Sequence, residues 1–520
     1  MNEIKLDEKV SVKQWRSSFY TACLLLVLLS CKSTNSDTQH ADLLSLSLVG
    51  GLTGAPANEP VELDLPEIKK RGRLIAIVDN SSTSYFIYKG QAMGYEYDLL
   101  SRLAQKLGVD LEIIITTSLD EALEMLQRGE GDIIAHNLTI TKERREKIAF
   151  TLHHNEVRQM LVQRKPQSWR NMTLDNIDKK LIRNPLDLAG KEVHVKKNSS
   201  HFSRLVNLSD EIGSDITIVE EDPTVEVEAL IKKVANGDID YTVADENVAL
   251  LNAAYYSNLD VSTPVSFHQR IAWGVRTNAP DLLKAVNGWI REIRKTPDYA
   301  VIYNKYFKNR SNMKMLASSN YSSISGSQIS PYDKHIKEAA SRIGWDWRLL
   351  AAVVYQESKF NPEAESWMGA AGLMQLMPET AEIFGAENPL DPKQSIMAGA
   401  NYLQWLDKFW TDEVPDPEER KKFVLASYNV GQGHVLDARK LARKHGRSPE
   451  IWEEHVAYFL EKKADPAFYN DEVVSLGYCR GGEPVRYVKN IMQRQARYRQ
   501  LIPDEVAPSH EKEQLLAMAK

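Results

Sequence analysis

The sequence predicts a multidomain protein in which a two-lobed α/β domain is followed by an all-α domain. A chain of 520 residues is too long for one small domain, so two or three folded units are expected. Strand-like and helix-like patterns alternate up to about residue 310, whereas the strand pattern is almost absent after residue 332. A serine-rich stretch, residues 318–327, lies between the two regions and has the composition of an interdomain linker.

The first region contains a repeated pattern of helix, glycine and strand. Residues 73–79 form an apolar run that is typical of a buried strand, and residues 95–107 place four leucines on one face of a helix. Residues 125–135 and 230–244 each show a helical pattern that ends at a glycine and is followed by a strand. Two similar halves predict two lobes, with a ligand crevice at the carboxyl ends of their strands.

The second region shows apolar residues at helical spacing. Trp347, Leu350, Ala351 and Val354 fall on one helical face, and residues 402–406 repeat the pattern. This spacing, without a strand signal, predicts an all-α domain.

Composition excludes several classes of function. Lys and Arg number 65 against 71 Asp and Glu, and no long basic block is present, so a nucleic-acid partner is not expected. The three cysteines form no CxxC pair and no zinc-type spacing with histidine, so no metal site is predicted. Residues 431–433 contain two glycines but lack the third glycine of a dinucleotide loop, and no cofactor is predicted.

The N-terminus has the pattern of an export signal. The apolar run of residues 19–30 follows Lys13 and Arg16, and it is shorter than the roughly 20 residues of a membrane-spanning helix. The end of this run, Leu28-Leu29-Ser30-Cys31, resembles the lipobox of bacterial lipoproteins. The resemblance implies that Cys31 is lipidated and, because Lys32 is not an aspartate, that the protein is held at the periplasmic face of the outer membrane. A buried apolar N-terminal helix with an incidental cysteine is the alternative.

These patterns give a set of domain boundaries. The predicted segments are a leader at 1–31, a linker at 32–64, a first folded domain at 65–310, a second linker at 311–331, a helical domain at 332–505 and a tail at 506–520.

Residues 70–308 resemble the family 3 bacterial solute-binding proteins, which bind amino acids in the periplasm. The segments that carry the resemblance are residues 94–99, 138–144 and 240–245. The resemblance implies that Arg144 clamps the α-carboxylate of a small ligand, an amino acid or a muropeptide, and that Asp245 in the second lobe receives its ammonium. A guanidinium fits a carboxylate with two charge-assisted hydrogen bonds. Asn137 and Thr139 precede the arginine and are expected to add polar contacts.

Arg144 and Asp245 each also have a simpler interpretation. Arg144 lies in a run of charged residues, 142–147, that is equally typical of an exposed helix start. Asp245 precedes a helical pattern at residues 246–249 and fits a helix N-cap. The identity of the ligand stays open, since residues 151–154 depart from the family pattern.

Residues 332–500 resemble the family 1 soluble lytic transglycosylase domain, which has a lysozyme-like fold. Four motifs occur in the family's order, and an ordered set is far more specific than a single match. The motifs are Glu357-Ser358-Lys359-Phe360-Asn361-Pro362, Gly369 to Pro378 (GAAGLMQLMP), Ala426-Ser427-Tyr428-Asn429-Val430-Gly431 and Tyr487-Val488.

Glu357 is the expected catalytic residue. It follows Leu350, Val353 and Val354 at helical spacing, so its carboxyl group leaves the apolar face at the last turn of the helix. Burial and the negative end of the helix dipole should both raise its pKa and keep it protonated as a general acid.

The resemblance implies a reaction on the glycan strands of peptidoglycan with one carboxyl group. Glu357 would protonate the oxygen between N-acetylmuramic acid and N-acetylglucosamine and later take the proton of the muramoyl C6 hydroxyl, giving a 1,6-anhydromuramoyl end without water. Ser366 would orient the acetamido group, Gln375 and Tyr487 would line the cleft, and Asn429 would lie near the catalytic centre.

Two other functions remain open at this point. Glu363 and Glu365 lie close to Glu357 in sequence, and a second carboxylate in the cleft would favour hydrolysis by water, as in a muramidase. A non-catalytic lipoprotein that binds a solute or the cell wall is the third hypothesis.

Overall fold

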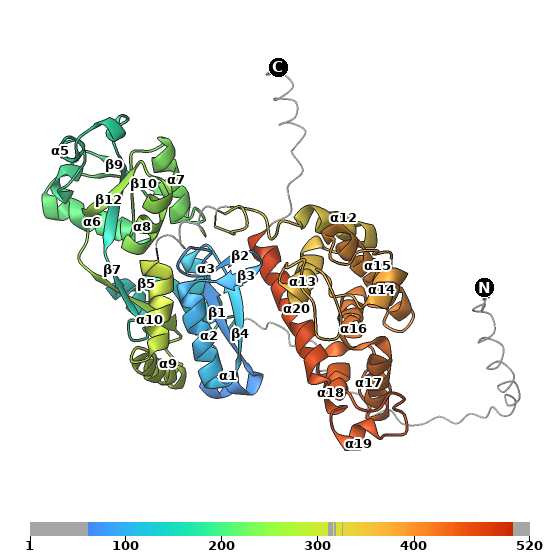
Figure 1. The fold of residues 1–520 in the computed structure, drawn as a ribbon. Coiled ribbons are helices and arrows are strands. Elements are labelled where there is room, and N and C mark those ends of the chain that lie inside the picture. The colour runs from blue at the N-terminus through green and yellow to red at the C-terminus, as the bar shows by residue number, and fades with distance from the viewer. Residues whose placement is uncertain (1–60, 310–315, 317–318, 325, 503–520) are drawn as a thin grey trace, which may run out of the picture. The chain divides into compact units, whose positions relative to one another are not determined.

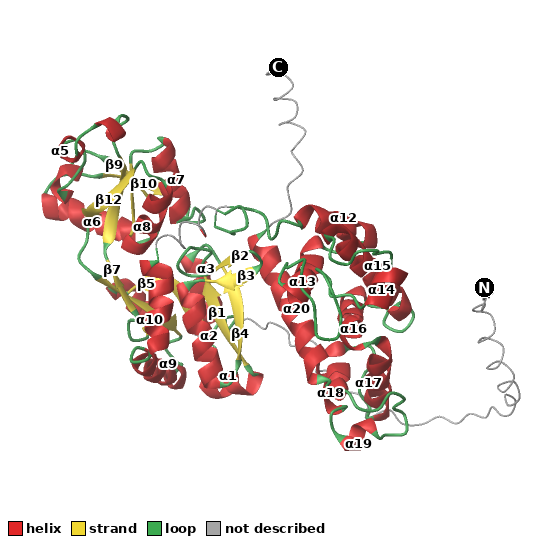
Figure 2. Cartoon of the chain, viewed as in Figure 1, coloured by secondary structure: helices red, strands yellow, loops and turns green. Residues whose placement is uncertain are grey.

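The computed structural model describes residues 61–309, 316, 319–324 and 326–502 (Figures 1 and 2). The predicted leader with Cys31, almost all of the first linker and the tail lie outside the described residues. Within the described part of the chain, no helix has the length and apolar character needed to cross a membrane.

The first lobe is built on a mixed sheet in the order β4-β1-β5-β13-β6, with β7 also paired to β13. β1 runs parallel to β4 and β5, and β13 runs antiparallel to β5. The strands are β1 (Arg73–Val78), β4 (Asp110–Ile115), β5 (Ile133–Thr139), β6 (Ala149–Phe150), β7 (Asn155–Val157) and β13 (Gln269–Val275). The helices of this lobe are α1 (Leu65–Arg71), α2 (Tyr95–Leu107), α3 (Leu119–Gln127), α4 (Lys142–Lys147), α9 (Pro280–Ile293) and α10 (Pro297–Tyr303). A short hairpin of β2 (Phe86–Tyr88) and β3 (Gln91–Met93) precedes α2.

The second lobe is a five-stranded sheet in the order β10-β9-β11-β8-β12. Its strands are β8 (Gln159–Arg164), β9 (Glu192–Lys196), β10 (Thr217–Glu221), β11 (Tyr241–Asp245) and β12 (Leu259–Pro264). Its α-helices are α5 (Leu174–Asp178), α6 (Ser200–Ile212), α7 (Val227–Asn236) and α8 (Glu246–Tyr255). The chain enters this lobe between β7 and β8 and leaves it between β12 and β13, so two connections join the lobes.

The sequence patterns explain why these elements form. β1 is buried at every position after Arg73, because helices cover the central strands of a parallel sheet on both faces. α2 ends at Gly108, whose φ of 72° lies in the left-handed region that glycine adopts without a steric penalty. The predicted α/β architecture with two lobes is therefore confirmed.

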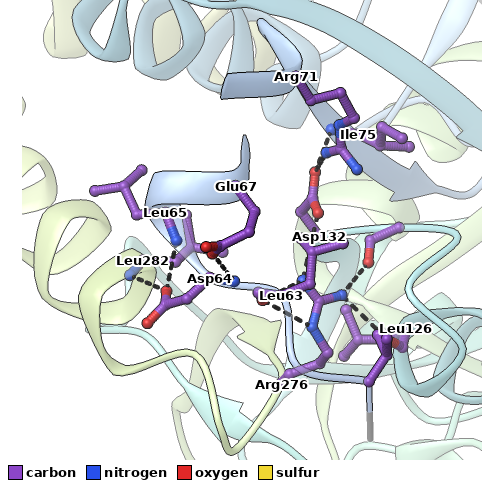
Figure 3. A network of polar contacts seen from close by, with 12 residues as sticks. Leu63, Asp64, Leu65, Glu67, Arg71, Ile75, Leu126, Asp132, Arg276 and Leu282 are labelled. Carbon is purple, nitrogen blue, oxygen red and sulfur yellow. Dashed lines mark hydrogen bonds and ion pairs between the residues drawn. The ribbon is translucent and has the colours of Figure 1, made fainter. Parts of the chain in front are cut away.

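A buried ion pair fixes the start of the first lobe (Figure 3). Arg276 and Asp132 have fully buried side chains and lie 3.4 Å apart, and Asp132 also accepts a hydrogen bond from the backbone N–H of Ile75 at 2.8 Å. The guanidinium of Arg276 donates to the backbone carbonyls of Leu63 and Leu126. Each charge thus has several partners, which offsets the cost of removing it from water.

The rest of the described chain is helical. Its elements are α12 (Asp333–Ile343), α13 (Trp347–Ser358), α14 (Pro378–Ile383), α15 (Pro392–Trp410), α16 (Pro417–Val430), α17 (Gln432–Lys444), the π-helical turn η4 (Trp452–Val456), α18 (Ala457–Lys462), α19 (Pro466–Tyr469) and α20 (Gly482–Leu501). Three of the helices begin with an aspartate N-cap followed by proline, at Asp391, Asp416 and Asp465. Both residues favour a helix start, since the carboxylate accepts free backbone N–H groups and proline lacks one. The predicted all-α second domain is confirmed.

Candidate functional site

Glu357 lies on the last turn of α13, a helix whose residues 348–354 are all buried. A helix that is apolar on every side lies in the core, so its C-terminal end brings Glu357 from the interior to a half-buried position. The hydroxyl of Tyr487, on α20, donates a hydrogen bond to Glu357 Oε1. Burial raises the pKa of Glu357 to about 7, and the hydrogen bond from Tyr487 opposes this shift.

The end of α13 is tied to the loop that carries the second motif. Ser358 Oγ lies 2.9 Å from the carbonyl oxygen of Leu373 and 3.1 Å from that of Val354. Lys359 and Phe360 then adopt positive φ angles of 52° and 62°, which end the helix. Glu357 is consequently held against the loop rather than at a free helix end.

Ser366 lies in a tight turn of that loop. Its Oγ accepts a hydrogen bond from the N–H of Ala370 at 3.0 Å, and the backbone N–H groups of Ser366 and Gly369 close the turn. Gly372, with a φ of 78°, is required here, because a Cβ atom would lie 1.8 Å from the carbonyl oxygen of Pro389. Trp367, next to the serine, is 94% exposed.

Gln375 makes its described contacts inside the loop. Its Nε2 donates to the carbonyl oxygens of Ala364, at 2.8 Å, and Gly372, at 3.0 Å, and its own φ is 46°. The amide group therefore braces the loop that follows Glu357. The expectation that Gln375 lines the cleft is not tested by these contacts, but the bracing role was not foreseen.

Tyr428, on α16, also lies near Glu357 and the loop that follows it. Its hydroxyl donates to the carbonyl oxygen of Met374 at 2.7 Å, and burial together with the charge of Glu357 raises its pKa well above the usual value. Burial and the charge of Glu357 raise the pKa of Tyr487 in the same way. Both phenols remain neutral donors at physiological pH, beside the acid. Asn429, the next residue of α16, is exposed.

Tyr428 was not among the predicted site residues. It occupies the third position of the motif that begins at Ala426, directly before the predicted Asn429, so the signal was present in the sequence. Glu363 and Glu365, the candidates for a second carboxylate, are exposed in the loop after α13. Among the described residues, the side chain that hydrogen-bonds to the Glu357 carboxyl group is that of Tyr487. This arrangement suits a single acid that gives up and regains one proton.

A second site lies in the crevice between the two α/β lobes. A cavity of about 140 Å³ is lined from both lobes and includes the predicted residues Asn137, Arg144 and Asp245. Arg144, on α4, donates from Nη1 to the carbonyl oxygen of Thr139 at 3.0 Å. Burial lowers its pKa, but a guanidinium stays protonated. Thr139 Oγ1 lies 3.4 Å from Ser200 Oγ of the other lobe.

Asp245 faces this crevice instead of capping a helix. It stands at the N-cap position of α8, yet its side chain makes no capping hydrogen bond. Oδ2 accepts a hydrogen bond from Asn137 Nδ2 of the first lobe at 2.7 Å, and Oδ1 lies 3.3 Å from Nε2 of His201. The structure thus brings Asn137, Arg144 and Asp245 to one cavity, with a polar contact between the lobes.

Further polar residues of the cavity were not predicted. Glu228 Oε1 accepts hydrogen bonds from the N–H and the hydroxyl of Ser82, at 3.1 and 3.0 Å. Burial and the charge of Asp79 raise the pKa of Glu226 to about 8. Asp79 directly follows β1, at the carboxyl end of a central strand, where ligand-binding groups are expected in such sheets. The position of Asp79 at the end of the predicted strand at residues 73–79 could therefore have indicated a ligand-binding role from the sequence.

Among the described residues, no group of three or more His, Cys, Asp or Glu side chains is placed to hold a metal ion.

Two family models match the chain. Residues 74–309 match the bacterial extracellular solute-binding proteins of family 3, and residues 334–451 match the transglycosylase SLT domain. The fold and the Glu357 centre therefore define a class of protein in which a solute-binding fold precedes a transglycosylase domain. Both resemblances inferred from the sequence motifs are confirmed.

The chain belongs to the membrane-bound lytic murein transglycosylase F family. It is 36% identical to the protein of that name from Desulfosudis oleivorans, over 82% of this chain and 90% of that protein. The Stutzerimonas stutzeri protein of the same name is 33% identical, over 89% of this chain and 91% of that protein.

Two solved structures each match about half of the chain. A mutant arginine-binding protein from T. maritima is 26% identical, with a TM-score of 0.40, over 47% of this chain and 99% of that chain. An ancestral amino-acid-binding protein is 30% identical, with a TM-score of 0.38, over 47% of this chain and 98% of that chain.

Proposed function

We propose that this chain is a lytic transglycosylase of peptidoglycan, which cleaves the β-1,4 bond between N-acetylmuramic acid and N-acetylglucosamine and leaves a 1,6-anhydromuramoyl end. The observation that carries the proposal is the half-buried carboxyl group of Glu357, with a pKa of about 7 and one hydrogen bond from Tyr487. A group with such a pKa is available in both protonation states near neutral pH, as one residue that serves first as acid and then as base requires.

The reaction balances with one carboxyl group. Glu357 donates its proton to the glycosidic oxygen, the bond from that oxygen to the muramoyl C1 breaks, and the sugar's acetamido group stabilises the positive charge. The C6 hydroxyl then bonds to C1, and its proton passes to the Glu357 carboxylate. Ser366 orients the acetamido group, Asn429 lies near the catalytic centre, and Tyr487 holds the carboxyl group. The enzyme regains its starting state, and no water is consumed.

The transglycosylase relatives favour this reaction over hydrolysis. A water-using muramidase of the inverting type needs a second carboxylate to activate the water, about 6.5–9.5 Å from the acid. The products distinguish the two reactions. Mass analysis of the released fragments should show anhydro ends, 18 Da lighter than reducing ends by the mass of one water; reducing ends alone would favour the muramidase.

Glu357→Gln tests whether the chain is an enzyme of this kind. The amide keeps the shape of the side chain but cannot give up a proton, so lysis of purified peptidoglycan should fall about 10²- to 10⁴-fold. Glu363→Gln, an exposed neighbour on the same loop, is the matched control and should retain wild-type activity. Unchanged lysis by Glu357→Gln would favour a non-catalytic wall-binding protein.

For the first domain, the proposal is a binding site for a small amino-acid or muropeptide ligand that modulates cleavage. Arg144 binds the carboxylate and Asp245 the ammonium, and Asn137 from the cavity lining adds a polar contact. Thr139, whose carbonyl oxygen accepts a hydrogen bond from Arg144, adds another. Calorimetry of the full chain with a panel of amino acids and muropeptides should detect binding that Arg144→Ala abolishes and Arg145→Ala, an exposed neighbour, does not. A ligand that binds without changing the lytic rate would separate binding from regulation.

The proposed location is the periplasmic face of the outer membrane, with a lipid on Cys31. The support is the lipobox-like sequence and the description of the relatives as membrane-bound. Cys31→Ser should release the protein from the membrane fraction and prevent incorporation of labelled palmitate. Cys23→Ser, within the apolar run, is the control.

A further inference from the structure

A row of aromatic side chains lies on the surface of the helical domain and leads away from the catalytic centre. Tyr402, Trp405 and Phe409 are spaced by three and four residues along α15, so they lie on one face of that helix. Phe384, directly after α14, packs beside them, and α14 lies against α15 (Figure 1). These four residues are named the aromatic ladder.

The three rings of the ladder on α15 are stacked in sequence, and Phe384 is inclined to them. The ring centroids of Tyr402 and Trp405 lie 6.1 Å apart, and those of Trp405 and Phe409 lie 6.0 Å apart, with an interplanar angle of 26° in both pairs. Phe384 lies 5.0 Å from Tyr402 and 6.4 Å from Trp405. The side chain of Asn401 donates to the carbonyl oxygen of Phe384 at 3.1 Å, which fixes the end of α14 to α15.

The ladder is continuous with the catalytic centre. The ring of Tyr402 lies 5.1 Å from that of Tyr428, whose hydroxyl contacts the carbonyl oxygen of Met374 and whose pKa is raised by burial and by the charge of Glu357. At its other end, Phe409 packs against Trp410, which is fully buried and donates from Nε1 to Ser427 Oγ on α16. The ladder therefore packs against Tyr428 at one end and against Trp410 at the other.

The outer rings of the ladder are open to solvent. Trp405 is 44% exposed and Phe409 is 37% exposed, and Gln404 and Lys408 beside them are exposed polar residues. Large aromatic side chains at adjoining exposed positions mark a binding surface more often than a scattered single residue does. Their flat faces are apolar, and they lose little conformational entropy when a ligand covers them.

We propose that the aromatic ladder is an extended glycan-binding site, on which sugar residues of the strand beyond the cleaved bond stack. The occupant follows from continuity with the catalytic centre: a strand bound at Glu357 and Tyr428 reaches Tyr402 next. A pyranose ring has an apolar face of C–H groups that suits an aromatic ring, and its hydroxyl and acetamido groups suit the polar residues beside the ladder. The inference rests on the proposed action on peptidoglycan.

The test compares long and short substrates with the full chain. Peptide-free glycan strands and a tetrasaccharide of the same sugars are given to the wild type, Trp405→Ala, Phe409→Ala and the double variant. Because an aromatic contact contributes about 0.5–1.5 kcal/mol, the ratio of kcat/KM for long strands to that for the tetrasaccharide should fall about 2- to 12-fold per ring. Trp405→Phe should restore most of the ratio, since it restores a flat ring. Tyr478→Ala removes an exposed aromatic residue outside the ladder and should leave the ratio unchanged.

An unchanged ratio in the double variant, or a loss that is equal for both substrates, would overturn the proposal. Binding gives an independent measurement: sedimentation of Glu357→Gln with long glycan strands should weaken when Trp405→Ala is added, and unaltered binding would also overturn it. If the wild type binds glycan strands but cleaves none of them, the proposed lytic function is wrong, whereas the proposed glycan binding by the aromatic ladder still holds.

Discussion

The α/β domain and the helical domain each place a glutamate beside an aromatic hydrogen-bond donor, and the two glutamates differ in their exposure to solvent. Glu96, on α2, is completely buried and accepts a hydrogen bond from Trp273 Nε1 at 2.6 Å. Burial raises its pKa to about 8. Glu357 has a similar donor in Tyr487 and a pKa of about 7, but it lies half-buried at a helix end.

The surroundings of Glu96 show why a raised pKa alone does not make a catalytic acid. His154 Nε2 lies 3.5 Å from Glu96 Oε2, which has the geometry of an ion pair. Burial lowers the pKa of His154 to about 3, however, so near pH 7 the histidine and the glutamic acid are both neutral. Two neutral groups packed against Trp273 form part of a core, whereas Glu357 is only partly buried.

The largest expected difference between the two glutamates is in activity. Glu96→Gln should keep lysis within about threefold of the wild type, against the loss of about 10²- to 10⁴-fold for Glu357→Gln. The amide can still accept the hydrogen bond of Trp273. The measurement is kcat/KM on purified peptidoglycan, with circular dichroism to confirm that both variants are folded. Equal losses in the two variants would remove the distinction based on access.

The pH dependence of activity sharpens the comparison at the helical domain. Only protonated Glu357 can donate, so kcat/KM should fall about tenfold per pH unit above pH 7. Tyr487→Phe removes the hydrogen bond that lowers the pKa of Glu357. The alkaline fall of kcat/KM should therefore move about half to one unit towards higher pH, as expected for the loss of one hydrogen bond. A fall that moves towards lower pH would contradict the assignment.

The smallest effect is on stability, at Glu96. Its folded pKa lies above its ordinary value of 4.5, so the stability it contributes is complete below about pH 4.5 and is lost as the pH rises to about 8. Glu96→Gln has no such loss. The variant's Tm relative to the wild type should therefore be about 5 °C higher at pH 8.5 than at pH 4.5. Thermal melts at the two pH values provide the measurement, and a constant difference in Tm would show that Glu96 does not titrate as described.

The architecture and the centre of the helical domain were predictable because local patterns encode them. The helix spacing before Glu357 predicted its place on the last turn, and the glycines at the ends of helices predicted the strands that follow. The contacts between side chains in the crevice were harder to predict. The contact of Asn137 with Asp245 joins residues 108 positions apart, and an aspartate before a helix is equally typical of an N-cap.

Residues that act through burial were the hardest to predict. Glu96 stands in the first turn of α2, where a glutamate usually lies in solvent, and only tertiary packing against Trp273 encloses it. The hydrogen bonds by which Gln375 braces its loop depend on a positive φ, which glutamine rarely adopts. The amino-acid sequence of the motif does not reveal this backbone conformation. The aromatic ladder joins residues of α14, α15 and α16, so its continuity exists only after folding.

The Asp416-Pro417 start of α16 keeps its helix cap in mild acid. The N–H groups of Glu418 and Glu419 bind the Asp416 carboxylate and lower its pKa, so this cap stays ionised when ordinary carboxyl groups begin to protonate. Acid strong enough to neutralise it would loosen the start of α16, the helix that carries Tyr428. We therefore expect activity to fall on the alkaline side through deprotonation of Glu357 and, in strong acid, through loss of the helix cap at Asp416.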